Sequence, residues 1–117
     1  MSPILDQGPW AVLFALFIGH ALADFPLQGA YLAEKKGRLR AGDTTEWLVA
    51  LFAHGLIHAG AVWLVTGSMM LGGIEFVLHC LIDTGKSERK YGLLVDQTLH
   101  LCCKVAYVVY WVNIPGP

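Results

Sequence analysis

Four apolar stretches of this sequence are each interrupted by ionisable residues that lie four positions apart. The most informative stretch is GGIEFVLHCLIDTGK, residues 72–86, in which Glu75, His79 and Asp83 follow one another at intervals of four. At about 3.6 residues per turn, this spacing places all three side chains on one face of an α-helix. Ionisable groups are costly in such apolar surroundings, so the stripe indicates a functional site that faces the interior of a helical bundle.

The composition is that of an integral membrane protein. Of the 117 residues, 56% are hydrophobic and 15% are charged, and the mean hydropathy is +0.55. Soluble domains carry roughly 25% charged residues. The length predicts one domain, residues 1–117. The net charge of -1 gives no indication of a nucleic-acid partner.

Four membrane-spanning helices are expected, over residues 9–28, 46–66, 69–85 and 93–112. Pro9 suits the first turn of a helix, and Pro26 is expected to kink or stop that helix because it has no backbone N–H. The N-terminus lacks the basic start and the cleavage site of a signal peptide, so the first segment is expected to stay as a membrane helix. The predicted fold class is therefore all-α, a four-helix transmembrane bundle.

The basic residues predict the orientation of this bundle. Seven of the eight Lys and Arg residues lie in or beside the first and third loops. The positive-inside rule places these loops in the cytoplasm and both termini outside. Tyr107, Tyr110 and Trp111 near the end of the last span are expected to form an interfacial belt. Membrane lipids are the expected partners, and a homodimer is also compatible with the sequence.

Each expected helix carries one polar pair at i, i+4, and the pairs include all five histidines. Lipid cannot solvate these groups, so the pairs must turn inward and form an intramembrane His/Asp cluster. Facing pairs of this kind are how helical bundles build metal sites. The candidate metal ligands are His20, Asp24, His54, His58, His79, Asp83, Asp96 and His100.

Imidazole and carboxylate groups together suit zinc, and also manganese or iron. Eight ligands exceed one tetrahedral site, so either two ions bind or some pairs orient the ligands of a single ion. Glu75 is the candidate catalytic residue, as a proton carrier, or else a further ligand, and Lys104 can neutralise it. Further candidates for contacting the substrate or orienting the ligands are Gln28, Lys35, Lys86 and Gln97.

Two sets of residues near these pairs complete the candidate site. Cys80, Cys102 and Cys103 are interpreted as small buried apolar residues, with a thiolate ligand beside His100 as the alternative. The basic residues at the cytoplasmic mouth can hold an anionic head group; they are Lys35, Lys36, Lys86 and Arg89.

Three classes of function fit this pattern. The first is a metal-dependent hydrolase acting on a lipid-like or phosphate-bearing substrate. The second is a transporter or channel for divalent cations or protons, which needs polar groups through the full membrane thickness. The third is a non-catalytic membrane accessory protein, whose polar network would serve stability alone.

Several motifs occur in an order that resembles a known family. They are HALADFPLQ at 20–28, EKK at 34–36, the H-x-x-x-H of 54–58, HCLIDTGK at 79–86 and DQTLH at 96–100. The sequence resembles the domain of unknown function 3307 family of bacteria and phages over about residues 13–107. The resemblance implies a small multi-span protein of the bacterial inner membrane. A distant similarity to membrane-bound metal-dependent hydrolases favours the hydrolase class by analogy.

Overall fold

The computed structural model describes residues 3–113, and within them the secondary structure is helical. A short 3-10 turn, Leu5–Gln7, precedes five α-helices. Four are long and one is short: α1 is Pro9–Asp24, α2 is Gly29–Lys35, α3 is Thr44–Thr66, α4 is Met69–Ser87 and α5 is Leu93–Asn113. The predicted all-α class is thus confirmed, with one helix more than the four expected.

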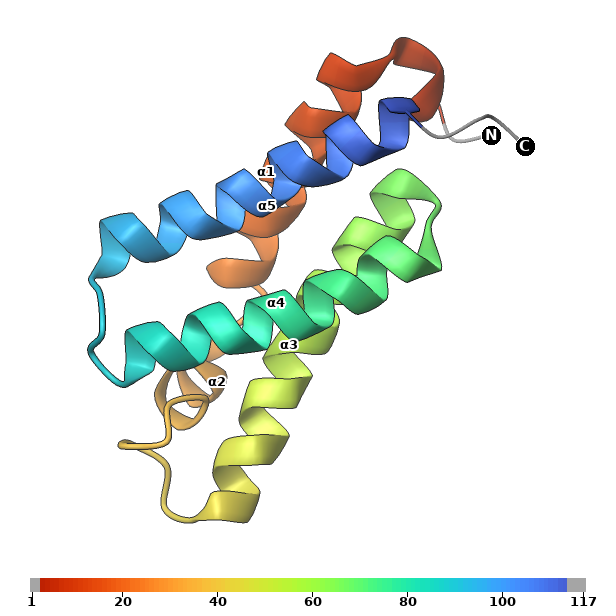
Figure 1. Ribbon diagram of the computed structural model, residues 1–117. Helices are drawn as coiled ribbons and strands as arrows, with labels where there is room; N and C mark the ends of the chain where they lie inside the picture. The colour runs from red at the N-terminus through yellow and green to blue at the C-terminus, as the bar shows by residue number, and fades with distance from the viewer. Residues whose placement is uncertain (1–2, 114–117) are drawn as a thin grey trace.

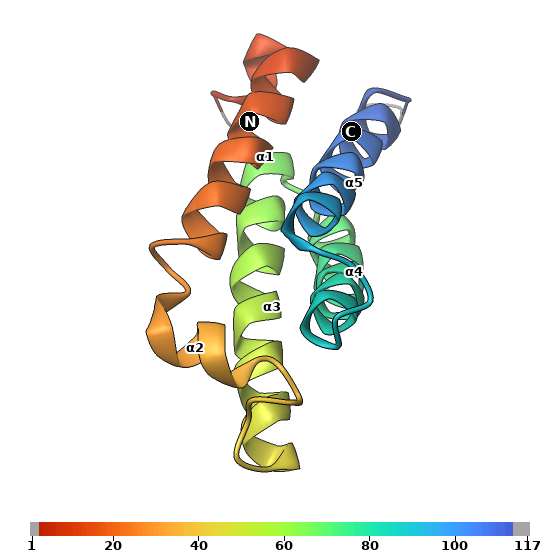
Figure 2. The same ribbon diagram turned by 90° about the vertical axis from the view of Figure 1, so that its left-hand side faces the viewer.

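The four long helices form a closed ring in which each contacts two neighbours. α3 packs against α1 and α4, and α5 packs against α4 and α1. Figures 1 and 2 show the described ends of the chain at one end of this bundle, with α2 and the α4–α5 loop at the other. The molecule is elongated, with extents of 46 × 23 × 22 Å. Both basic loops therefore lie at the same end.

The first predicted span, residues 9–28, is divided in the structure. α1 ends at Asp24, and α2 leaves at an angle of 85° to it. Pro26 lacks the N–H that would continue the helix, and the amide of Leu27 instead donates to the carbonyl of Leu22 at 2.9 Å. α2 then packs against α3. The turn thus brings the following basic loop back toward the bundle.

Side-chain caps fix the start of α3 and of α4. The Asp43 carboxylate accepts from the Glu46 amide at 2.7 Å, and the Ser68 hydroxyl accepts from the Leu71 amide at 3.1 Å. Gly67 ends α3 with a φ of 72°, a left-handed conformation that glycine adopts at little cost. The connection between α3 and α4 is therefore a tight hairpin, as its short uncharged sequence predicts.

The interior of the bundle has two parts. At the end near the termini, an apolar core contains Val12, Leu16, Val62, Leu71 and Val108. At the opposite end, the buried side chains are mainly histidines and carboxylates. The outward faces carry large exposed apolar side chains, for example Trp10, Phe14, Ile18 and Leu22 along one stripe of α1. Polar groups inside and apolar groups outside reverse the usual arrangement of a soluble bundle.

Candidate metal centre

Each long helix contributes one predicted pair to a single buried cluster. The pairs lie on the last two turns of α1, the middle of α3, the second half of α4 and the first two turns of α5. All eight residues are buried: His20, Asp24, His54, His58, His79, Asp83, Asp96 and His100. The imidazole rings lie close together, with ring centroids 3.6 Å apart for His58 and His79 and 4.2 Å apart for His79 and His100. The structure therefore brings together the whole set of ligands predicted from the sequence.

Asp24 is the centre of a first group of donor atoms. Its Oδ1 lies 3.1 Å from His58 Nε2 and 3.2 Å from His54 Nε2. His79 completes the group, and one donor atom from each of the four residues lies within 4.8 Å of the others. These residues come from α1, α3 and α4, so packing of the three helices assembles the group.

A second group combines Asp83, Asp96 and His100, which come from α4 and α5. His100 Nε2 lies 3.1 Å from Asp83 Oδ1 and 3.3 Å from Asp96 Oδ1. The other oxygen of Asp83, Oδ2, lies 3.3 Å from His54 Nε2 and 3.4 Å from His79 Nε2. Asp83 therefore contacts both groups, one with each carboxylate oxygen.

These distances fit metal coordination. Two ligand atoms about 2.1 Å from a tetrahedral ion lie roughly 3.4 Å apart, close to the spacings in both groups. Within the described residues, several buried donor and acceptor atoms have no hydrogen-bond partner, including His79 Nε2 and Asp96 Oδ1. Buried polar atoms are normally satisfied, so these two atoms are suited to an additional ligand.

His20 and Gln97 link the two groups. A third set of clustered donor atoms combines Glu75, His79 and His100. Among the described residues, His20 belongs to none of the three sets, although its Nε2 lies 3.5 Å from Asp24 Oδ2. The Gln97 amide nitrogen donates to Asp24 Oδ2 at 2.8 Å and to Asp96 Oδ2 at 3.0 Å, and its oxygen lies 3.0 Å from His20 Nε2. This geometry suits groups that orient the carboxylates.

Glu75 is buried and has close partners at both carboxylate oxygens. Oε1 accepts from Lys104 Nζ at 2.7 Å and lies 3.2 Å from His79 Nδ1, while Oε2 accepts from the Tyr107 hydroxyl at 2.6 Å. The predicted contact between Lys104 and Glu75 is confirmed. A carboxylate behind a histidine fixes the orientation of the ring and the tautomer that presents Nε2. Glu75 is thus placed to orient His79, and its role as a proton carrier stays a prediction.

Tyr107 is a further functional candidate, and it lies inside the bundle and not at its surface. It is expected in an interfacial belt, but only 4% of it is exposed, and its hydroxyl points at Glu75. The expectation for Tyr107 is therefore wrong. The sequence spacing does indicate the inward position of Tyr107. It follows Asp96, His100 and Lys104 at nearly constant helical intervals and so lies on the same inward stripe of α5.

The other predicted residues lie around the cluster. Lys35, at the end of α2, pairs with Glu46 of α3 at 3.7 Å, outside the cluster. Gln28 lies in the turn before α2, and its Oε1 is buried with no hydrogen-bond partner among the described residues. Cys80 is buried beside α3, as predicted, with its Sγ 3.9 Å from the Leu51 carbonyl. Cys102 is exposed because it lies on the outward face of α5, so the expectation of burial is wrong for this residue. Lys86 lies near the end of α4, with its Nζ 4.0 Å from Asp96 Oδ2.

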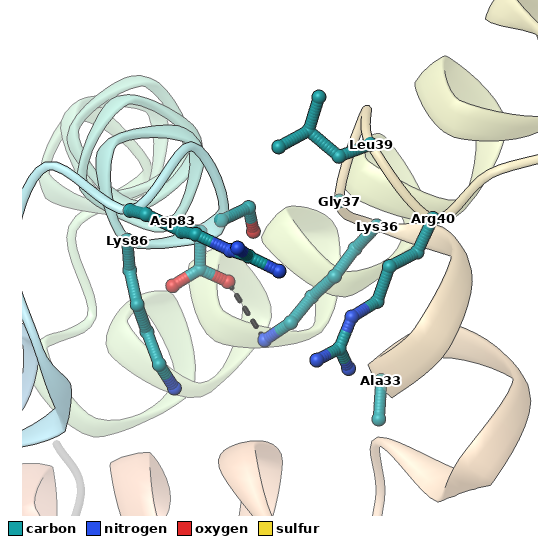
Figure 3. Close-up of a pocket in the computed structure, with 9 residues that line it drawn as sticks. Ala33, Lys36, Gly37, Leu39, Arg40, Asp83 and Lys86 are labelled. Atoms are coloured by element: carbon teal, nitrogen blue, oxygen red, sulfur yellow. Dashed lines mark hydrogen bonds and ion pairs between the residues drawn. The ribbon is translucent and has the colours of Figure 1, made fainter.

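A basic pocket opens directly onto the cluster at Asp83. It has a volume of about 240 Å³ and lies between the loop after α2 and the end of α4. Figure 3 shows the Lys36 side chain crossing from this loop to the Asp83 carboxylate. Lys36 Nζ lies 2.9 Å from Asp83 Oδ2 and 3.4 Å from His54 Nε2. The pocket is the part of the site in which this basic loop meets the buried carboxylates.

An ion pair holds the walls of the pocket together. Arg38 bonds to Glu88 across the gap between the loop and α4, and this pairing lowers the pKa of the Glu88 carboxyl. Next to this pair, Gly37 is buried, and a Cβ there would lie 3.2 Å from the Ser87 side chain. A side chain at position 37 would therefore press against Ser87 at the end of α4.

The fold and the cluster define a class: a small helical bundle whose interior is a cluster of histidines and carboxylates beside a basic pocket. The sequence profile of the family described as protein of unknown function (DUF3307) matches residues 12–115. The chain therefore belongs to this family, as its motifs predict. Comparison with curated proteins and with solved structures gives no match.

Proposed function

We propose that this protein is a membrane-embedded hydrolase that depends on one or two divalent metal ions. The observation that carries the proposal is the convergence of eight buried histidine and aspartate side chains, two from each long helix. Buried carboxylates and imidazoles in such number are rare without a function. Zinc is the favoured ion because of the mixed imidazole and carboxylate donors, with manganese or iron as alternatives.

The outer surface supports placement in a membrane. Of the described helices, α3 is long and apolar enough to cross a bilayer. α1 and α2 together are also long and apolar enough if the bent pair forms one span. α4 and α5 carry buried charged residues, including Glu75, Asp83 and Lys104, which lower their hydropathy although their outward faces are apolar. The 46 Å length of the molecule is comparable to a bilayer of about 40–45 Å with its head groups. We therefore propose four spans in the bacterial inner membrane.

The two donor groups suit a pair of ions. Asp24, His54, His58 and His79 would hold one ion, Asp96 and His100 the other, and Asp83 would contribute one oxygen to each. A bound divalent ion supplies a water of lowered pKa and polarises the bond to be cleaved. Behind the ligands, Glu75 holds His79, and Lys104 with Tyr107 holds Glu75. These contacts would keep the ligand geometry rigid.

The polarity of the two ends favours hydrolysis over cation transport. Apolar side chains fill the bundle interior at the end near the termini, where Val12, Leu16 and Leu71 are buried. A continuous pathway would need polar groups there. At the other end, Lys36 and Lys86 line the opening, and their charges would repel an entering cation. A basic opening instead suits a lipid-like substrate that bears phosphate or another anion.

Metal content of the detergent-purified protein tests this proposal. We expect one or two equivalents of zinc, manganese or iron by plasma mass spectrometry, and loss of most of that metal in His54→Ala and His79→Ala. Glu46→Gln is the matched control, because Glu46 lies at the start of α3 outside the cluster and bonds to Tyr31. If wild-type protein binds none of these metals after reconstitution with each, the hydrolase proposal fails.

A further inference from the structure

We infer that the basic pocket beside Asp83 binds the terminal phosphate of a phosphate monoester. This inference deepens the proposed function and rests on it for the reaction, although the pocket itself is built from cationic side chains. Four of them line it, Lys36, Arg40, Lys86 and Arg89, against the single carboxylate of Asp83. Such an excess of positive charge in one small cavity favours a ligand with two negative charges.

The size of the pocket limits what can enter. At about 240 Å³ it is smaller than the roughly 300–1,000 Å³ of sites for drug-sized ligands. A phosphate group and its nearest carbon atoms fit this space, whereas an acyl or isoprenoid chain must remain outside. The zwitterionic head groups of common lipids would bring a further cation next to four others. The pocket therefore selects an unsubstituted phosphate over a phosphodiester with a cationic head.

The backbone at Arg89 supports a functional role for this residue. Arg89 is the only non-glycine residue in the described part of the chain with a positive φ, 62°. Glycine is the usual residue at such a helix end, and any other L-residue there carries a conformational cost. The backbone is anchored in this conformation, because the Arg89 amide donates to the Lys86 carbonyl at 2.9 Å. This backbone conformation places Arg89 in the lining of the pocket, where its guanidinium can bond to phosphate oxygens.

The position of the pocket connects it to the reaction. Lys36 lines the pocket, and its ammonium also donates to Asp83 Oδ2 at 2.9 Å. Asp83 in turn contacts both donor groups of the cluster. A phosphate held by Arg40 and Arg89 would thus face Asp83 and lie next to the proposed metal ligands. A lipid phosphate and a soluble phosphate monoester share this chemistry.

Calorimetric titration of the detergent-purified full-length protein tests the inference. The probes are glycerol 3-phosphate as the soluble monoester, and short-chain phosphatidic acid with phosphatidylcholine as the lipid pair, all in the presence of a metal chelator. We expect saturable binding of at least one monoester and at least tenfold weaker binding of phosphatidylcholine. Binding of only the soluble or only the lipid monoester still supports the site and identifies the source of the phosphate.

Two variants and one control localise the binding. Arg40→Gln and Arg89→Gly should each weaken phosphate binding roughly tenfold, as for the loss of one charge-assisted hydrogen bond. Arg89→Gly also suits the left-handed backbone, so it should fold at least as well as wild type. Lys90→Gln removes an equal charge from the adjacent exposed position and should change the affinity less than about twofold.

The outcomes separate this inference from the proposed function. No saturable monoester binding, or equal weakening by Lys90→Gln, overturns the phosphate site even if the protein carries metal. Phosphate binding in the chelated protein that depends on Arg40 and Arg89 supports the site even if no metal is found. If no metal is found but phosphate binds in this way, the hydrolase proposal fails and the phosphate site is still supported.

Discussion

At the scale of single residues, the interior of this protein depends on pairing each buried charge. Glu75 and Lys104 are each 1% exposed and lie 2.7 Å apart, with Tyr107 and His79 completing the shell around the carboxylate. Taking two charges out of water is costly, and their attraction offsets that cost only while both are present. Loss of one partner should therefore be worse than loss of both.

We expect Lys104→Met to destabilise the protein by about 3 kcal/mol, because it leaves the Glu75 carboxylate buried without its cation. The double variant Glu75→Gln/Lys104→Met should recover most of that loss, since no unpaired charge remains. Thermal unfolding in detergent, followed by circular dichroism, measures both. A double variant no more stable than Lys104→Met would show that the pairing of these charges is not what Lys104 provides.

At the scale of helices, the contact between α3 and α4 positions the histidine stack. The two helices approach closely at Gly72, where a Cβ would lie 3.0 Å from the Ala59 carbonyl oxygen and 3.1 Å from Trp63 Cβ. A backbone oxygen cannot move aside as a flexible side chain can. The same helix pair carries His58 and His79, whose ring centroids are 3.6 Å apart. The distance between α3 and α4 at the hairpin end therefore affects the distance between these two rings.

Alanine substitutions at two adjacent glycines of α4 should change the stability in opposite directions. Gly72→Ala should lower stability by about 1–2 kcal/mol, because the added methyl group pushes α4 away from α3. Gly73→Ala meets nothing within 4 Å and should raise stability by about 0.5–1 kcal/mol through its better helix propensity. Unfolding midpoints of the two variants in detergent test this. A Gly72→Ala protein as stable as Gly73→Ala would contradict close packing at this point.

At the scale of the whole molecule, charge and shape indicate how the bundle lies in a membrane. The loops of residues 36–43 and 88–92 carry basic residues and lie together at the end opposite the described chain ends (Figure 1). The described apolar faces surround the bundle between these ends. The positive-inside rule then predicts that the basic pocket faces the cytoplasm and both termini lie outside.

Reporter fusions test this orientation. Alkaline phosphatase needs an oxidising compartment, so it should be active when fused at the C-terminus and inactive when fused in the loop of residues 88–92. Green fluorescent protein at the same two positions is the control and should give the opposite pattern. The reverse pattern would invert the topology, and recovery of the unfused chain in the soluble fraction would refute membrane insertion.

Which residues face inward follows from local spacing along the chain. Helical periodicity is local, so the spacing of four in His20 and Asp24, and in the three other pairs, sufficed to predict one polar stripe per helix. Because exposing such groups in an apolar environment is costly, the stripes were predicted to meet. The same stripe on α5 includes Tyr107, although an aromatic residue near the end of an apolar helix is usually expected at the surface.

How the inward residues combine depends instead on the packing of the helices. The division of these residues into donor groups, with Asp83 contacting more than one of them, depends on which helices are neighbours and at what depth. Spacing within one helix carries no such information. The turn after Pro26 places Lys36 at 2.9 Å from Asp83, although 47 residues separate them in the chain. The basic pocket arises in the same way, because the fold of a loop against a distant helix end is set by non-local packing.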